Sequence, residues 1–502
     1  MTALPRLRPL CAALLLSCAA GAAPAADLMQ AYDLARQSDP QLAAADANRL
    51  VTQEGVPQAR SNLLPQISAS AGYNRTRSDS EGSRVISIDP PIISTQAGSS
   101  ENSSRSYGID LTQSIYDHRN YTNLRASRSR SAGADATYDA ANDALMVRVA
   151  EAYFNTLTAI DSLAFARAEE RAVKRQLDQA DQRFEVGLTA ITDVHEARAR
   201  YDSSRANAIA AEVFLDDARE ALTEITGQAM TNLQGLSDDF APSKPVPDDI
   251  ARWVETALAE NPTLLAQEYA VQAAGHDIST ARAGHLPYLT GSASYGKGFN
   301  WGESRSGGFT EPSNNEGTDK TIGIQLVVPI FTGGLTQSRV RQAIYTRDAN
   351  EDVLEQQRRA VTRQTRNAFR SLLAGISEIE ARRQALVSAQ SALEATEAGF
   401  EVGTRTIVDV LISQQTLFSA QSGYSTSRHN FLVNTLRLKQ AAGTIAINDV
   451  QDVNRNLVRD AEAALDLPPS ADGSAITPDG ESQVEPVEPV EIEPVPQVPP
   501  GG

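Results

Sequence analysis

The chain contains one long unit twice. The segment Phe184–Val194 reads FEVGLTAITDV and the segment Phe400–Val410 reads FEVGTRTIVDV, at an offset of 216 residues. The same offset relates Leu222–Gly227 to Leu438–Gly443. This spacing is far longer than the 20–50 residues of a solenoid repeat. It predicts a duplicated half-protein, in which two halves share one order of helices and strands.

The upstream parts of the two copies also match. Leu28–Tyr73 aligns without gaps on Ile250–Tyr295, so that prolines fall on prolines and Tyr73 falls on Tyr295. We therefore expect a first repeat over residues 27–249 and a second over residues 250–458. A segment rich in Pro, Glu and Val follows at 459–502, and its composition predicts disorder.

Residues 1–26 have the pattern of a secretory signal peptide. Arg6 and Arg8 precede the apolar stretch Leu10–Ala20, and Ala23–Ala25 offers a small-residue cleavage site. Both cysteines of the chain lie inside this segment, so the exported protein would have no disulfide. A second interpretation is lipoprotein processing at Cys18. No later stretch reaches 18 consecutive apolar residues, and no membrane-spanning helix is predicted.

Alternating residues predict four strands, and the first strand of each repeat follows a proline, Pro65 or Pro287. In the first repeat the alternation covers Gln66–Asn74 and Tyr107–Ile115, and in the second it follows Pro287 and runs over Thr321–Ile330. Each strand has one apolar row and one row of small polar residues. The polar segments Arg77–Arg105 and Phe299–Lys320 between the strands of each repeat are expected to be loops.

Between the strands and the duplicated FEVG motifs lie very long helical patterns. His118 to about Phe184 contains no proline, and a rise of 1.5 Å per residue gives a helix on the order of 100 Å long. A second helix is expected from Thr189 to Ile225. The second repeat has the same pair, from Gly334 to about Gly399 and from Thr404 to Ala442. Asp27–Arg60 is expected to be a helix interrupted near Pro40 and Pro57.

A soluble sheet can also have strands with one apolar row and one polar row. The export signal, the two long polar segments between strands and the shortage of another large apolar core favour a sheet that lies in lipid. Such a sheet must close on itself, because unpaired backbone groups are costly in a membrane. Four strands are too few to close a channel, so several chains must share one barrel. A helix of about 100 Å likewise needs neighbouring copies to pack against. Both arguments predict a hollow homo-oligomer.

The motifs resemble the TolC family of outer-membrane efflux and secretion ducts. The matching residues are Phe400–Val410, Phe184–Val194 and Gly284–Pro287, and the resemblance extends from Asp27 to about Val458. It implies an α+β membrane protein, a homotrimer with a 12-stranded outer-membrane β-barrel of four strands per protomer, continuous with a periplasmic α-helical tunnel. It also implies a periplasmic adaptor protein and an inner-membrane ABC, RND or MFS transporter as partners.

The resemblance places a gate at the duplicated turns. Three copies of Asp409 would form a carboxylate ring around a narrow opening. Arg405 would reach Thr192 and Asp193 of a neighbouring helix pair and latch the turns. Family members of the TolC type have a tyrosine at the position of Phe400 and a second aspartate at the position of Ile412. We therefore expect one acidic ring and weaker block by cations.

A simpler interpretation is that Asp193 and Asp409 only stabilise the first turns of their helices. The turns also present side chains outward as a possible surface for adaptor docking, although ordinary turn chemistry explains the same residues. These turn residues are Val186, Gly187, Leu188, Val402, Gly403 and Thr404.

Other classes of function have less support. The formal charge of −18 argues against binding to nucleic acid. The five histidines lack the spacing of a metal site, and no nucleophile motif or P-loop occurs, so we expect no enzyme activity, metal or cofactor. An exported coiled-coil tether or adhesin without a pore remains the alternative. The sequence does not distinguish drug efflux from type I protein secretion.

Overall fold

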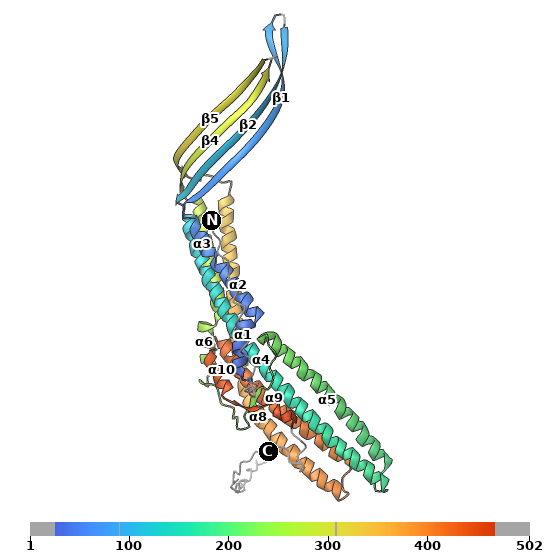
Figure 1. Cartoon of the computed structure of the whole chain (residues 1–502). Coiled ribbons are helices and arrows are strands. Elements are labelled where there is room, and N and C mark those ends of the chain that lie inside the picture. Colours follow the sequence, from blue (N-terminus) through green and yellow to red (C-terminus); the bar gives the residue numbers. More distant parts are fainter. Residues whose placement is uncertain (1–25, 90, 307–308, 467–502) are drawn as a thin grey trace, which may run out of the picture.

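The molecule is long and has its sheet at one end and its helices below it (Figure 1). The computed structural model describes residues 26–89, 91–306 and 309–466. The expected signal peptide, apart from Ala26, and most of the expected acidic tail lie outside these residues. Among the described residues, no helix is both long enough and apolar enough to span a membrane.

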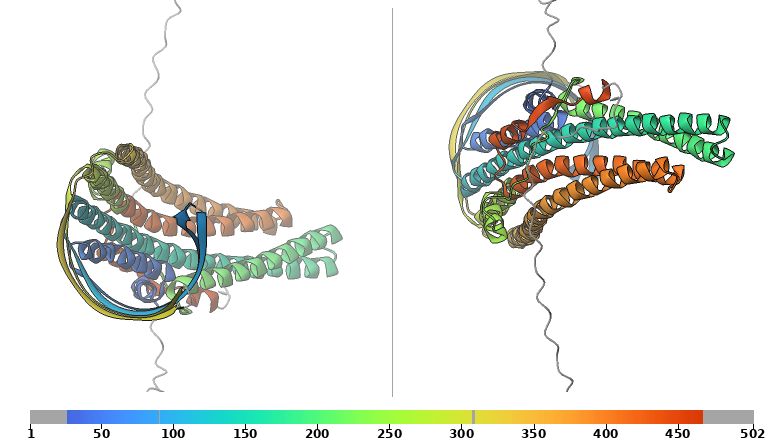
Figure 2. Two further views of the ribbon diagram at one scale, coloured as in Figure 1. Left: turned by 90° about the horizontal axis from the view of Figure 1, so that it is seen from above. Right: turned by 90° about the horizontal axis from the view of Figure 1, so that it is seen from below.

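The four strands form one antiparallel sheet. They are β1 (Gln66–Ile88), β2 (Pro91–Tyr116), β4 (Tyr288–Ser306) and β5 (Phe309–Val327). Their order in space is β1-β2-β4-β5, so β1 and β5 are the two edges. Seen from above, the sheet is a curved arc that does not close (Figure 2).

The register of the sheet confirms the two predicted rows. Ile67 pairs with Leu111, Leu111 with Ala293, and Ala293 with Ile322 across all four strands. The next position along pairs Ser68 with Asp110, Asp110 with Ser294, and Ser294 with Thr321. Because successive side chains of a strand point to opposite faces, one face of the arc is apolar and the other is polar.

The prediction that residues 77–105 and 299–320 are loops is wrong, because the strands continue through both segments. β1 and β2 remain paired through Arg77 with Glu101 and far beyond, and β4 and β5 remain paired up to Ser306 with Phe309. In these parts of the strands both faces of the sheet are polar, and the backbone groups still pair without apolar side chains. Instead, oppositely charged side chains on neighbouring strands form ion pairs, as Lys297 does with Glu316 at 2.7 Å, diagonally across the ladder. In the other direction, β5 ends at Val327, before the expected Ile330.

The helices follow the predicted order in both repeats. The first repeat has α1 (Leu28–Ser38), α2 (Pro40–Gln53), α3 (Gly55–Ser61), α4 (His118–Glu185) and α5 (Ile191–Thr226). The second has α6 (Ile250–Glu260), α7 (Pro262–Arg282), the 3₁₀ turn η1 (Ala283–His285), α8 (Leu335–Glu401) and α9 (Ile407–Ala442). The predicted break near Pro40 is confirmed, since Asp39 caps α2 and Pro40 is its first residue.

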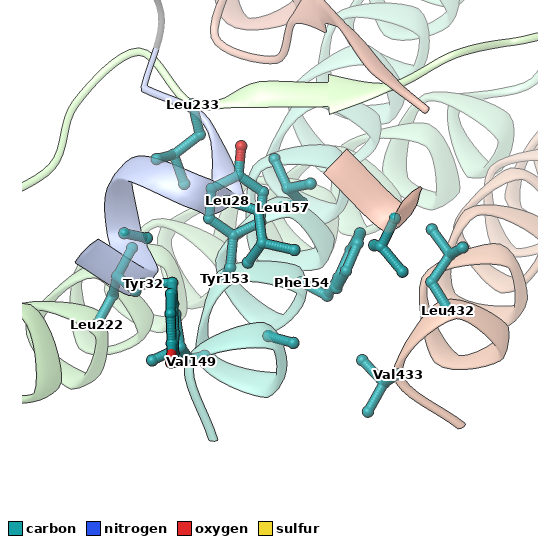
Figure 3. Packing of buried hydrophobic residues seen from close by; sticks show 14 of the residues in the cluster. Leu28, Tyr32, Val149, Tyr153, Phe154, Leu157, Leu222, Leu233, Leu432 and Val433 are labelled. Atoms are coloured by element: carbon teal, nitrogen blue, oxygen red, sulfur yellow. The ribbon is translucent and has the colours of Figure 1, made fainter. Parts of the chain in front are cut away.

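Short elements surround the middle of the long helices. β3 (Gln234–Leu236) pairs with β6 (Leu457–Asp460), and α10 (Ile447–Asn454) and α11 (Ala463–Asp466) flank β6. The largest apolar cluster lies here and joins α1, α4, α5, α9, α10 and the small sheet. Figure 3 shows Tyr153 and Phe154 of α4 between Leu28, Leu222, Leu233 and Leu432. The Tyr153 hydroxyl donates to the carbonyls of Ala26 and Gln234 at 3.0 and 2.7 Å.

A buried histidine lies beside this core. His429 of α9 is 4% exposed, its Nδ1 is 2.9 Å from the Thr158 hydroxyl, and its ring is 5.6 Å from that of Phe154. Burial lowers the pKa of His429 to about 4, with Asp161 opposing the shift and Arg428 adding to it. The imidazole is therefore neutral in the folded protein at neutral pH.

This histidine should make the folded state sensitive to acid. In the unfolded chain it takes up a proton below about pH 6.5, but in the folded chain only below about pH 4. The unfolded state thus binds more protons between these values. Stability is unaffected above pH 6.5 and falls by about 3 kcal/mol per protomer as the pH drops to 4.

We expect His429→Asn to remove this component, because asparagine can still bond to Thr158 and does not titrate. The measurement is the thermal unfolding midpoint of the purified protein at pH 7.5 and at pH 5. The matched control is His195→Asn, since His195 is exposed on α5. An unchanged difference between the two pH values in His429→Asn would contradict the assignment.

Candidate gate at the helix tips

The two long hairpins end in nearly identical turns, which we call the helix tips (residues 186–190 and 402–406). Gly187 and Gly403 adopt φ values of +76° and +77°. In each tip the glycine N–H donates to the carbonyl three residues back, and the next N–H donates to the carbonyl five residues back. This is the Schellman pattern, which favours glycine because a side chain is strained at positive φ. Gly187 therefore ends α4, and Gly403 ends α8 in the same way.

The two aspartates stabilise the helices that leave the tips. Asp409 and Thr406 form a capping box at the start of α9, with the Thr406 N–H donating to Asp409 at 2.9 Å. Asp193 lies in the first turn of α5 and accepts a hydrogen bond from Thr189. Hydrogen bonds from the Thr406 backbone and hydroxyl lower the pKa of Asp409, and Arg405 lowers it further. Asp409 is thus held as a carboxylate.

The two tips differ in sequence at the position from which one hairpin contacts the other. Residue 183 is arginine in the first copy, whereas the equivalent residue 399 is glycine. The Arg183 guanidinium lies over the Phe400 ring, 4.7 Å from its centroid. This stacked pair connects the end of α4 to the end of α8, and such cation–π contacts are worth about 0.5–2 kcal/mol.

Gly399 leaves room for Arg405. A Cβ at position 399 would lie 2.7 Å from Arg405 Cγ, and the Arg405 N–H donates to the Gly399 carbonyl at 3.2 Å. Arg405 is therefore folded back against its own tip. Among the described residues of this protomer, it makes no hydrogen bond or ion pair with Thr192 or Asp193.

An apolar cluster, here called the apolar joint, connects the two hairpins just above the tips. Its buried members are Val173, Leu177, Ala180, Val194, Ala197, Ile407 and Leu411, with Phe400, Val408 and Tyr201 packed at its margin. The side chains come from α4, α5 and α9 and from the end of α8. Further from the tips, Arg200 of α5 donates to Gln415 of α9. The two hairpins of one protomer are thus held together at three successive levels.

The outermost side chains of the tips are free of such contacts. Val186, Leu188 and Val402 are 69%, 75% and 76% exposed, and Thr404 is exposed as well. Exposed apolar residues grouped at the end of a molecule are typical of a surface that a partner covers.

Sequence reasoning missed three residues of this region. Arg183 and Arg200 have no local motif, because their partners lie on another hairpin, and Gly399 contacts Arg405 of its own tip. One signal was present, however: positions 183 and 399 differ in chemistry within an otherwise similar FEVG context. Within the described part of the chain, no cluster of acidic, histidine or cysteine side chains is arranged to hold a metal.

Comparison with known proteins identifies the class. Residues 31–228 and 253–444 match the family described as "Outer membrane efflux protein". These ranges cover most of both repeats, and the chain belongs to this family.

Individual relatives match over nearly the whole chain. The chain is 40% identical to "Outer membrane protein TolC" of Vibrio cholerae over 453 residues, which is 90% of this chain and 98% of that protein. It is 37% identical to "Outer membrane protein TolC" of Escherichia coli, covering 90% and 89%. It is 29% identical to "Alkaline protease secretion protein AprF" of Pseudomonas aeruginosa, covering 86% and 87%.

Solved structures show the same fold. The outer-membrane channel CmeC of Campylobacter jejuni matches with a TM-score of 0.67 at 17% identity, covering 86% of this chain and 90% of that one. VceC of Vibrio cholerae matches with a TM-score of 0.64 at 19% identity, covering 83% and 96%. The solved structures confirm the predicted fold, and the family match and the TolC relatives confirm the predicted location: the protein is a trimeric outer-membrane exit duct, and its arc is one third of a barrel that continues into a helical tunnel.

Proposed function

We propose that the helix tips form a passive gate that a periplasmic adaptor and an inner-membrane transporter open. The observation that carries this proposal is the set of contacts between the two hairpins near their ends. The Arg183–Phe400 pair, the apolar joint and the Arg200–Gln415 hydrogen bond all connect α4 and α5 to α8 and α9. Separation of the hairpins at the tips would break these contacts and leave the sheet unchanged.

The Arg183–Phe400 pair would hold the tips together in place of the tyrosine hydroxyl that TolC-type members of the family have at position 400. Phe400 cannot donate a hydrogen bond, but its ring accepts the positive charge of Arg183. In the trimer, Arg405 would turn away from its own tip toward Thr192 and Asp193 of a neighbouring hairpin. That contact is part of the proposal, with the Arg405 position beside Gly399 as its starting point.

Selectivity at the gate would come from Asp409. Its carboxylate is ionised and lies at the start of α9, beside the tip. Three copies around the axis would form one ring of negative charge, which attracts cations and repels anions. Ile412, one turn further along α9, is 55% exposed and contributes no second ring.

We expect Asp409→Asn to abolish block of the channel by a trivalent cation such as hexaamminecobalt. Thr406 remains the N-cap of α9, and the asparagine side-chain oxygen can still accept from the Thr406 N–H, so the tip should keep its fold. Single-channel conductance of purified trimers in planar lipid bilayers measures the effect. Glu185→Gln, which removes one exposed charge at the end of α4, is the matched control and should leave the block unchanged.

Two outcomes would count against this gate. Equal cation block in Asp409→Asn and in the native protein would remove Asp409 from the constriction. Block as tight as that of a channel with two acidic rings would contradict the role given to Ile412. A purified protein with no conductance at all would contradict the duct itself.

The cargo and the energy source would come from the partners. AprF is named for secretion of a protease, and another relative, BepC of Brucella suis, is named as an efflux protein. Both uses fit a duct that has no chemistry of its own, and we propose that this chain catalyses no reaction. The exposed side chains of the helix tips would be the surface on which the adaptor docks.

A further inference from the structure

The long helices of one protomer form a row with two free ends. In the lower half of the molecule α4 packs against α5 on one side and α9 on the other, and α9 packs against α8. Figures 1 and 2 accordingly show α5 and α8 on opposite sides of the helical part. In the upper half, α2 and α3 pack against α4, which packs against α7, and α7 packs against α8. This order mirrors the strand order β1-β2-β4-β5.

Closure of the barrel therefore fixes which helices of two copies meet. In the described part of the arc, β1 and β5 are the edge strands and each has one unpaired side, so β5 of one copy must pair with β1 of the next. α8 continues on the β5 side, and α5 lies on the β1 side of α4. Around the trimer, α8 of one protomer must face α5 of its neighbour.

The free face of α8 carries a row of arginines. Arg363, Arg366 and Arg370, here called the arginine stripe, recur at helical spacing on one exposed face. They line a shallow groove beside Leu258 of α6, together with Arg359. Arg359 pairs with Glu355 at 2.8 Å, whereas the three stripe arginines have no carboxylate within 4 Å among the residues that the structure describes.

The free face of α5 carries the opposite charge. Asp217, Glu220 and Glu224, here called the acidic stripe, are all exposed, and no ion pair engages them within the described chain. The buried residues Leu215, Ala218 and Leu222 lie on the other side of α5 and face the protomer's own core. The acidic stripe thus faces away from α4 and from the other long helices of its own protomer. Exposed Ile209 and Val213 extend the same face toward the tip.

The two stripes lie at the same height. Arg183 and Phe400 are in contact close to the ends of α4 and α8, so the two tips are level. At a rise of 1.5 Å per residue, Arg366 and Arg370 lie about 50 Å above the end of α8, and Glu220 and Glu224 lie about 45–50 Å above the start of α5.

We propose that the arginine stripe of each protomer docks on the acidic stripe of the next and forms an ionic seam around the middle of the trimer. Complementary charge at equal height on the two faces that closure brings together supports this pairing. Guanidinium groups form paired hydrogen bonds with carboxylates, so the seam would also fix the vertical register between copies. The inference rests on the trimer and is independent of the gate.

Charge reversal tests the seam in the full-length protein. Arg366→Glu with Arg370→Glu places like charges opposite each other, and so does Glu220→Arg with Glu224→Arg. Each pair should cause loss of the trimer on gel electrophoresis at a temperature at which the native trimer persists. The combination of all four substitutions exchanges the two charges and should restore the trimer. A merely misfolded variant would not be rescued in this way.

Two controls make the result specific. Lys174→Glu with Arg175→Glu changes the charge equally on exposed positions of α4, inside the row, and should leave the trimer intact. Arg370→Cys with Glu220→Cys should form a disulfide between copies under oxidation, while either cysteine alone should not. No cross-link, or no rescue by the fourfold exchange, would overturn the seam.

A competing occupant of the arginine stripe is the chain's own residues 467–502, which contain seven acidic residues and no basic one. Deletion of these residues is expected to leave the trimer as stable as the native one. If the deletion alone destabilises the trimer as strongly as the arginine reversal does, the occupant is this segment and the proposed pairing between copies is wrong.

Discussion

Phe400→Ala combined with Arg183→Ala is expected to give trimers with a permanently raised conductance. The stacked pair contributes about 1 kcal/mol, and the half-buried ring contributes about 2 kcal/mol of apolar burial at the joint. A loss of about 3 kcal/mol per protomer increases the open population on the order of a hundredfold. Planar lipid bilayers report this population directly, because a closed tip passes little current.

The duplication supplies the matched control. Phe184 is the equivalent of Phe400 in the first copy, but it is 42% exposed and lies outside the apolar joint. Phe184→Ala with Arg175→Ala removes the same two side-chain types and should leave the conductance at the native value. If both double variants conduct like the native trimer, the stacked pair does not hold the gate closed.

Leu188→Asp or Val402→Asp is expected to abolish export in cells without changing the conductance of the purified trimer. Both side chains are at least three-quarters exposed, so a charge costs nothing in the free protein. In a docked complex the same charge would be buried without a partner, which costs several kcal/mol and prevents stable association. Export of a dye or of a secreted protein by a strain that depends on this duct measures the effect.

A third exposed position separates docking from general surface charge. Val246 is 89% exposed in the segment between α5 and α6, far from the tips in sequence and fold. Val246→Asp should export like the native protein. Normal export by both tip variants would show that the adaptor does not depend on these residues, whereas a changed conductance would show that the substitution acts on the gate.

Much of the fold was predictable because its elements are long and regular. A helix of 68 residues without proline and an alternation that covers four strands give strong periodic signals. The prediction from sequence missed the polar parts of the strands, because the polar residues between Arg77 and Arg105 have the composition of a loop. Only the partner strand shows that this backbone is paired, as Asn74 with Ser104 and Arg77 with Glu101 illustrate.

The candidate gate was predictable only in part, for a related reason. The tips have local signals, namely a glycine after a helix and an aspartate in the first turn of the next. The contacts between hairpins have none. Arg183 and Phe400 are more than 200 residues apart, and nothing near either residue indicates the other. The one sequence signal for this contact is a difference between the two repeats, which have arginine at position 183 and glycine at the equivalent position 399.

The unbroken course of α4 and α8 limits how the length of this protein can vary. One residue inserted in the middle of α4 would rotate every side chain below it by about 100° and would turn the apolar joint away from its partners. It would also lower one tip relative to the other by about 1.5 Å. Deletions and insertions are therefore tolerable only in whole turns, and only when all four long helices change together. The far ends of the strand hairpins carry no such restriction and are free to lengthen two residues at a time.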